Sequence, residues 1–216
     1  ACYLMLYGLM YPDRVQGWSL DPADDYPYHF SLARWPLILN STNLKAAPIS
    51  GLAVAACLLH GRHPQAGRWL DMARRSARAF SVIFGTDGCY DEGASYWCYT
   101  TDSLTLYTTV LERTLGIDDS ALFNWPDIVR CELGMAMPTL GHDDDCVNFG
   151  DAVNIYDNNA SAWTARRFRD PVAQYFGETM GDQRNEYGLI FFDPTQKAAA
   201  PGPELHDRRF DNDIVT

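Results

Sequence analysis

Two neighbouring segments in the first half of the chain differ in how their apolar positions are arranged. From Ile49 to Leu59 the sequence ISGLAVAACLL is apolar on every side, whereas from Gln65 to Phe84 charged side chains follow one stripe. A helix that is apolar all round is typical of a buried position, and a striped helix of a surface position. The short HGRHP turn between them predicts a helical hairpin, and Pro64 suits the first turn of its second helix.

The rest of the chain predicts more helices and little β-structure. A loop rich in Gly and Asp, Thr86 to Gly93, precedes a helical stretch that runs to about Leu115. Two short Gly-bounded segments, 146–149 and 188–192, are the only strand candidates. Further helices are expected over residues 28–39, 125–137 and 158–177, interrupted or bounded by Pro36, Pro126, Pro138 and Pro171.

This order of elements predicts a mainly α protein with two layers of helices. Alternating inner and outer helices fit either an α/α toroid or a solenoid, and no sequence repeat near 34 or 40 residues separates the two. The last stretch, from Lys197, is polar and rich in Pro and Gly, which is typical of a linker. We therefore expect a helical domain over 1–195 and a linker, or the start of a β-rich domain, over 196–216.

Composition narrows the class of protein. The 216 residues are 47% hydrophobic, enough for a packed core, and the longest strongly apolar stretch, Ile49 to Leu59, is too short to span a bilayer. We therefore expect a soluble protein with no membrane partner. The net charge of −11 argues against nucleic-acid binding, which needs a basic footprint. The six cysteines form no CxxC pair, so most are expected to be buried thiols, and localisation stays open.

The helix expected after Gly93 carries a stripe of hydroxyl groups. Its members recur at spacings of three and four residues and so share one helical face: Tyr96, Tyr99, Thr100, Ser103 and Tyr107. Phenols and their rings could line a sugar-binding cleft, because they combine hydrogen bonding with apolar faces. Aromatic packing in a core explains the same pattern without any ligand.

The loop and the start of this helix carry a specific resemblance. The stretch DGCYDEGASYWCY, Asp87 to Tyr99, resembles the DGxYxEGxxYWxY signature of the heparinase II/III-like polysaccharide lyases and related alginate lyases of bacteria. Upstream, Asn43-Leu44 followed by Ser50-Gly51 is similar to the family's NW…GG segment, although Leu44 replaces the common Trp or His. Downstream, NFGDA at 148–152 and the segment 189–194 ending in Asp-Pro agree in order and spacing.

The resemblance, which covers roughly residues 30 to 195, implies an α/α toroid and a β-elimination reaction. A proton leaves C5 of a uronic acid, the bond from C4 to the glycosidic oxygen breaks, and an unsaturated sugar forms. The amide of Asn43 would neutralise the substrate carboxylate and stabilise the developing charge. Tyr96 would transfer the proton as base, acid or both, with Tyr99 one turn away as the competing candidate.

The same resemblance implies an anionic polysaccharide or oligosaccharide as partner, and no cofactor or metal. Candidate substrate contacts are Lys45, Glu92, Trp97 and Ser103. Family members also use catalytic groups from a later β-sandwich domain, so a missing C-terminal domain is part of the expectation. Which uronic polymer is cleaved is not readable from the sequence.

Other charged residues have simpler interpretations. Two basic clusters are possible contacts for substrate carboxylate or sulfate: Arg62, Arg68, Arg74, Arg75 and Arg78, and then Arg166, Arg167 and Arg169. The simpler interpretation of the first cluster is the solvated face of an outer helix. No histidine has metal-ligand spacing, and His142 beside Asp143 to Asp145 reads as an acidic surface loop.

Two alternatives stay open. An α/α-barrel glycoside hydrolase would use paired carboxylates, such as Glu92 with Asp91 or Asp102. A non-catalytic carbohydrate-binding or scaffold fragment would use its aromatic residues only for stacking or packing.

Overall fold

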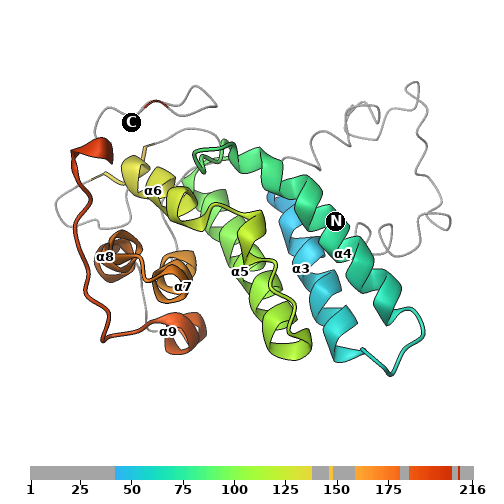
Figure 1. The fold of residues 1–216 in the computed structure, drawn as a ribbon. Coiled ribbons are helices and arrows are strands. Elements are labelled where there is room, and N and C mark those ends of the chain that lie inside the picture. The colour runs from blue at the N-terminus through green and yellow to red at the C-terminus, as the bar shows by residue number, and fades with distance from the viewer. Residues whose placement is uncertain (1–41, 138–145, 148–158, 181–184, 206–208, 210–216) are drawn as a thin grey trace, which may run out of the picture. The chain divides into compact units, whose positions relative to one another are not determined.

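The computed structural model describes residues 42–137, 146–147, 159–180, 185–205 and 209 (Figure 1). In these residues the chain is mainly α-helical, with seven α-helices and no β-sheet; an isolated bridge pairs Ala136 with Cys146. The chain divides into two compact units, each described by itself. Unit 1 comprises 1–80 and 106–119, and unit 2 comprises 81–105 and 120–216. Helix α5, Ala94–Leu115, contributes its first half to unit 2 and its second half to unit 1.

The described part of unit 1 is built on the expected hairpin. Helix α3, Asn43–Leu58, packs against α4, Ala66–Phe80, side by side in Figure 1. Their burial differs as the sequence predicts, except that Leu58 and Leu59, at the end of the apolar stretch, are 68% and 37% exposed. Nine residues of α3 are buried, whereas α4 buries only the stripe Ala66, Trp69, Ala73, Ala77 and Phe80. The hairpin prediction is confirmed.

In the turn before α4 the His63 ring stacks on Trp69, with centroids 4.6 Å apart. Its Nδ1 accepts a hydrogen bond from the backbone N–H of Gln65 at 3.2 Å. One of the N–H groups at the start of the helix is thereby satisfied.

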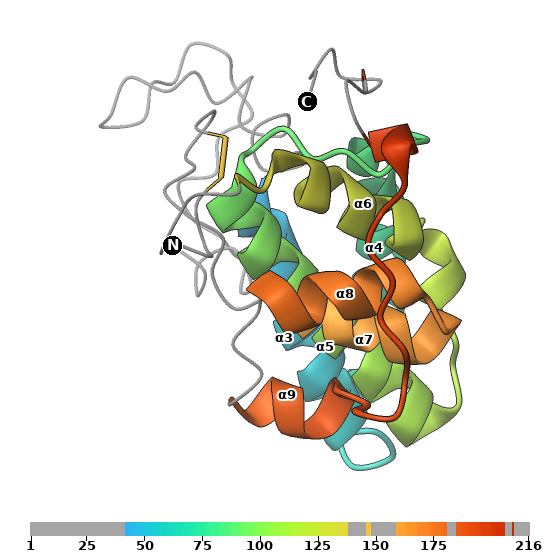
Figure 2. The ribbon, with the colours of Figure 1, turned by 90° about the vertical axis from the view of Figure 1, so that its left-hand side faces the viewer.

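Unit 2 packs its helices around aromatic side chains. Helix α6 spans Trp125–Met135, and α7, Asn159–Phe168, contacts α6, α8 and α9. Trp125 lies at the centre, with ring centroids 4.7 Å from Trp163 and 5.4 Å from Phe123. A view turned by 90° shows α8, Pro171–Met180, and α9, Glu186–Phe191, with these helices (Figure 2).

The single helix expected over 158–177 is in fact two. Arg169 has a φ of 55°, which ends α7, and the Asp170 carboxylate accepts from the backbone N–H groups of Val172 and Ala173 at 2.9 and 3.0 Å. Asp170 is thus the N-cap of α8, with Pro171 as its first residue. Arg130 of α6 binds the same carboxylate at 2.8 Å, which ties α6 to the start of α8.

The strand expected at 188–192 is also wrong. Residues 188–191 belong to α9, because the Asn185 side chain accepts a hydrogen bond from the backbone N–H of Gly188 at 2.8 Å and caps a helix there. In the other strand candidate, Cys146 pairs with Ala136 in an isolated bridge. The helix expected at 28–39 and residues 148–149 lie outside the described residues.

The first part of the expected linker lies against α8. The backbone N–H of Ala199 donates to the carbonyl of Pro171 at 2.9 Å, and the Gln196 amide donates to the carbonyl of Asp170 at 3.1 Å. A short 3-10 helix, Pro203–Leu205, buries Leu205. The domain boundary at residue 196 stays a prediction.

Candidate active site

The loop that precedes α5 is held in one conformation by its glycines and by the start of α6. Gly88 has a φ of +82°, and a Cβ there would lie 2.2 Å from the backbone nitrogen of Ile128. Only glycine allows this approach between the loop and α6. The amide of Asn124 donates to the carbonyl of Thr86 at 3.3 Å, and Asp87 accepts from the backbone N–H of Cys89 at 3.3 Å. The motif DGCYDEG is therefore a built turn that fixes where α5 begins.

Within the loop, Tyr90 connects the motif to α5 through its side chain. Its ring is fully buried and its hydroxyl donates to the carboxylate of Glu92. Thr100 donates to the Tyr90 hydroxyl at 3.2 Å. Burial, and then the hydrogen bond to Glu92, raise the pKa of Tyr90, so this phenol is a proton donor within the structure. Glu92 therefore anchors the turn, and its predicted contact with substrate stays a prediction.

On the first half of α5, the hydroxyl stripe follows the border between the buried and the exposed side. Tyr99 is 51% exposed, and Tyr96 and Ser103 are partly exposed. Thr100 is fully buried, and so is Tyr107, which belongs to unit 1. The structure thus brings Tyr96, Tyr99 and Ser103 together on the accessible side of one helix.

Trp97, expected to contact substrate, has no exposed surface. Its ring centroid lies 6.4 Å from that of Phe176 in α8, so it packs α5 into unit 2. Its predicted role as a substrate contact stays a prediction.

A polar cluster lies beside this face. The Asn159 amide, at the start of α7, donates to the carboxylate of Asp102 at 2.9 Å, and Asn159 is 1% exposed. Burial, and then the negative charge of Asp102, raise the pKa of Tyr187 in α9. The hydrogen bond joins α5 to α7, and the charge of Asp102 acts on Tyr187 of α9. The sequence pattern pointed to Asp102 only as a hydrolase acid or base, because its hydrogen-bond partner Asn159 lies 57 residues away in the chain.

In unit 1, the first turn of α3 carries the other predicted residues. Asn43 is its first residue and is 5% exposed, while Lys45 is half-buried. Burial lowers the pKa of Lys45, which brings this ammonium closer to its neutral form. Asn43 and Lys45 lie two residues apart, as predicted, at the start of a buried helix.

Glu132 is an unusual carboxylate of unit 2 that no sequence motif pointed to. It is fully buried in α6, and neither of its carboxylate oxygens has a hydrogen-bond partner among the residues that the structure describes. Burial, and then the nearby Cys89, raise the pKa of Glu132 to about 8. A signal existed in the sequence, because Trp125, Ile128, Glu132 and Met135 recur at the spacing of one helical face.

The arginines of α7 serve structural contacts. Arg166 donates to the carbonyl of Ile190 at 2.6 Å, Arg167 to the hydroxyl of Ser120 at 3.4 Å, and Arg169 lies 3.6 Å from the carboxylate of Asp193. The NFGDA segment and His142 lie outside the described residues. The five described cysteines are free thiols and are buried, as expected.

Comparison with protein-family models, curated proteins and solved structures finds no match to this chain. In the part of the chain that the structure describes, no helix is both long and apolar enough to cross a membrane. Over the same residues, no group of three His, Cys, Asp or Glu side chains is placed to hold a metal ion.

Proposed function

We propose that the protein is a polysaccharide lyase that cleaves a uronic-acid polymer by β-elimination, within a toroid of helical hairpins. One observation carries the proposal: the motif DGCYDEG forms a built turn, and the helix it starts presents Tyr96, Tyr99 and Ser103 on its accessible side. A phenol held on a rigid helix is suited to proton transfer at a bound sugar.

In this mechanism Tyr96 takes the C5 proton or protonates the leaving C4 oxygen, or does both in turn. The electron pair of the C5–H bond forms the double bond between C4 and C5 as the C4–O bond breaks. The amide of Asn43 stabilises the charge that develops on the uronate. Tyr99, the more exposed phenol, is the alternative proton carrier, and Ser103 and Lys45 are expected to contact the substrate.

Polyuronates such as alginate and heparan sulfate provide the test, with ultraviolet absorbance of the unsaturated product as the readout. We expect Tyr96→Phe and Asn43→Ala each to lower the rate at least about 100-fold, the scale of a lost acid–base or charge-stabilising group. Tyr175→Phe is the matched control, because Tyr175 is also a partly exposed helical tyrosine of unit 2. Thermal unfolding of each variant checks that the fold is kept.

Three outcomes separate the candidates. Loss of activity in Tyr99→Phe with normal turnover by Tyr96→Phe would move the proton transfer to Tyr99. New reducing ends without absorbance would indicate a hydrolase that uses paired carboxylates such as Glu92 with Asp91 or Asp102. Binding without any product would indicate a carbohydrate-binding fragment. If the protein binds none of these polymers, the proposal is rejected.

A further inference from the structure

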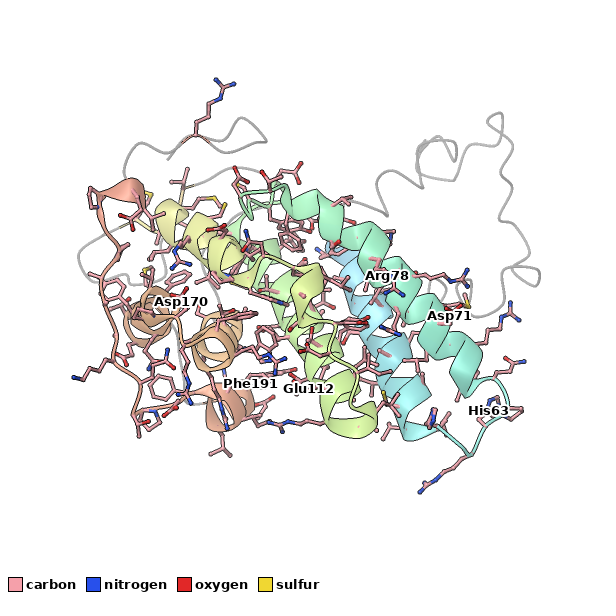
Figure 3. All side chains as sticks on the ribbon, viewed as in Figure 1. His63, Asp71, Arg78, Glu112, Asp170 and Phe191 are labelled. Atoms are coloured by element: carbon pink, nitrogen blue, oxygen red, sulfur yellow. The ribbon has the colours of Figure 1, made fainter. Side chains whose placement is uncertain are left out.

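The outward side of α4 carries a row of arginines. Arg68, Arg75 and Arg78 are exposed, and with Asp71 they follow spacings of three, four and three residues, so they share one helical face. The opposite face, from Ala66 to Phe80, is the stripe that α4 buries. Figure 3 shows Asp71 and Arg78 extending from this helix and His63 from the turn before it.

The charge on this face is not cancelled within the helix. Asp71 is the only acidic residue of α4 and lies 2.9 Å from Arg75, with both side chains at least 60% exposed. Such a pair is weak, because water screens it. Arg74 belongs to a different environment, since it binds the buried Asp119. The charge of Arg78 also lowers the pKa of Asp119, but the Arg78 side chain is exposed. A locally basic face therefore stands on a chain whose net charge is −11.

We propose that this face, Arg68, Arg75 and Arg78, is a docking surface for an anionic polysaccharide, outside the catalytic residues. The proposal rests on the proposed function, because it takes the same class of polymer as ligand. Guanidinium groups pair with carboxylate and sulfate through two parallel hydrogen bonds. Arg68 and Arg78 are about 15 Å apart along the helix axis, which suits an extended polymer rather than a single small anion.

Two features of the same face favour a polysaccharide over other anionic partners. None of its side chains is aromatic, and single-stranded nucleic acids bind largely by stacking on aromatic rings. Within α4 no large apolar side chain is exposed, and a helix that lies on a membrane needs an apolar face to insert. The interaction that this face offers is therefore ion pairing between its arginines and anionic groups spaced along a polymer.

The test compares polymer binding by the full chain and by charge variants. The probes are long-chain alginate and heparin, with binding followed by titration calorimetry at several salt concentrations. In the Tyr96→Phe background, which prevents cleavage, we expect Arg68→Gln with Arg75→Gln to weaken binding about 10-fold at low salt and to reduce its salt dependence. Asp71→Asn should strengthen binding about 2-fold, because it removes the one acidic group of the face.

The matched control is Arg113→Gln with Lys197→Gln, which removes the same charge from two exposed residues on other segments. Equal weakening by both double variants would reduce the effect to net charge and overturn the proposal. Unchanged binding by the α4 variant, or stronger binding of single-stranded DNA or anionic vesicles than of either polysaccharide, would also overturn it. If the wild type binds the polymers without cleaving them, and the α4 double variant weakens this binding, the lyase assignment is refuted and the docking surface is supported.

Discussion

Two buried carboxylates, one in each unit, have opposite surroundings. In unit 1, Asp119 is 5% exposed and accepts hydrogen bonds from Arg74 at 2.7 and 2.8 Å and from the Tyr107 hydroxyl at 2.6 Å. In unit 2, Glu132 is fully buried, and within the described part of the chain its oxygens have no hydrogen-bond partner. The Arg74 guanidinium lowers the pKa of Asp119, while burial raises the pKa of Glu132 to about 8.

The difference separates a stabilising group from a costly one. Asp119 joins α4 to the second half of α5, so its charge holds unit 1 together. Glu132 lies near Cys89 of the motif loop, and at neutral pH burial keeps it mostly protonated. Buried groups with strongly shifted pKa values gather at functional sites, so Glu132 belongs among the residues to test beside the candidate active site.

The largest loss of stability is expected from Asp119→Ala, which should lower the free energy of unfolding by about 3 kcal/mol, because it breaks a buried ion pair and leaves the Arg74 guanidinium without its carboxylate partner. Urea unfolding at pH 7 measures the change, and hydrogen exchange should locate it in α3, α4 and the second half of α5. Asp71→Ala is the control, since its exposed pair with Arg75 should change stability by less than about 0.5 kcal/mol.

The pH dependence gives the sign of the same interaction. Because the folded pKa of Asp119 is lowered, its contribution is present above the unfolded pKa of about 4 and is lost as the pH falls toward the folded value. Wild type should therefore lose stability below about pH 4 more steeply than Asp119→Asn. Equal losses in Asp119→Ala and Asp71→Ala would contradict the structural role of the buried pair.

Glu132→Gln should have the opposite effect and stabilise the protein by about 3 kcal/mol at pH 7. The folded pKa of Glu132 is raised, so its stability contribution is complete below about pH 4.5 and declines as the pH rises to about 8. The gain from Gln should therefore be small at pH 5 and largest near pH 8, in urea unfolding followed across this range. The exposed Glu186→Gln is the control, and a gain that does not grow with pH would reject the unpaired, protonated Glu132.

Part of the fold could be predicted from the sequence pattern, and part depends on tertiary packing. The α3–α4 hairpin was predictable, because an all-round apolar helix beside a striped one is a local signal. The break between α7 and α8 was not, since it depends on the positive φ of Arg169 and on the Asp170 side chain as a cap. Glu132 occupies a position of the helical period that faces the core, but a charged residue is usually exposed. Whether its side chain is buried or exposed is decided only by how the helices pack.

Some features of the candidate site could also be predicted from the sequence, and others could not. The motif order predicted the turn before α5 and the accessible Tyr96 and Tyr99. It did not predict that Thr100 and Tyr107 of the same stripe are buried, because the stripe runs along the border of the core, where neighbouring helices determine exposure. The hydrogen bond from Asn159 to Asp102 joins segments 57 residues apart, beyond any local pattern.

The smallest effects are expected from two tyrosines that donate to carboxylates, one in each unit. Tyr107→Phe should cost only about 1 kcal/mol, because Asp119 keeps both hydrogen bonds from Arg74. Tyr90→Phe should cost more, about 2 kcal/mol, since it removes the donor to Glu92 and leaves the buried Thr100 hydroxyl without its acceptor. Urea unfolding of the two single variants measures both costs. If Tyr107→Phe proves the costlier change, Arg74 does not hold Asp119 by itself, and the contrast between Asp119 of unit 1 and Glu132 of unit 2 would have to be revised.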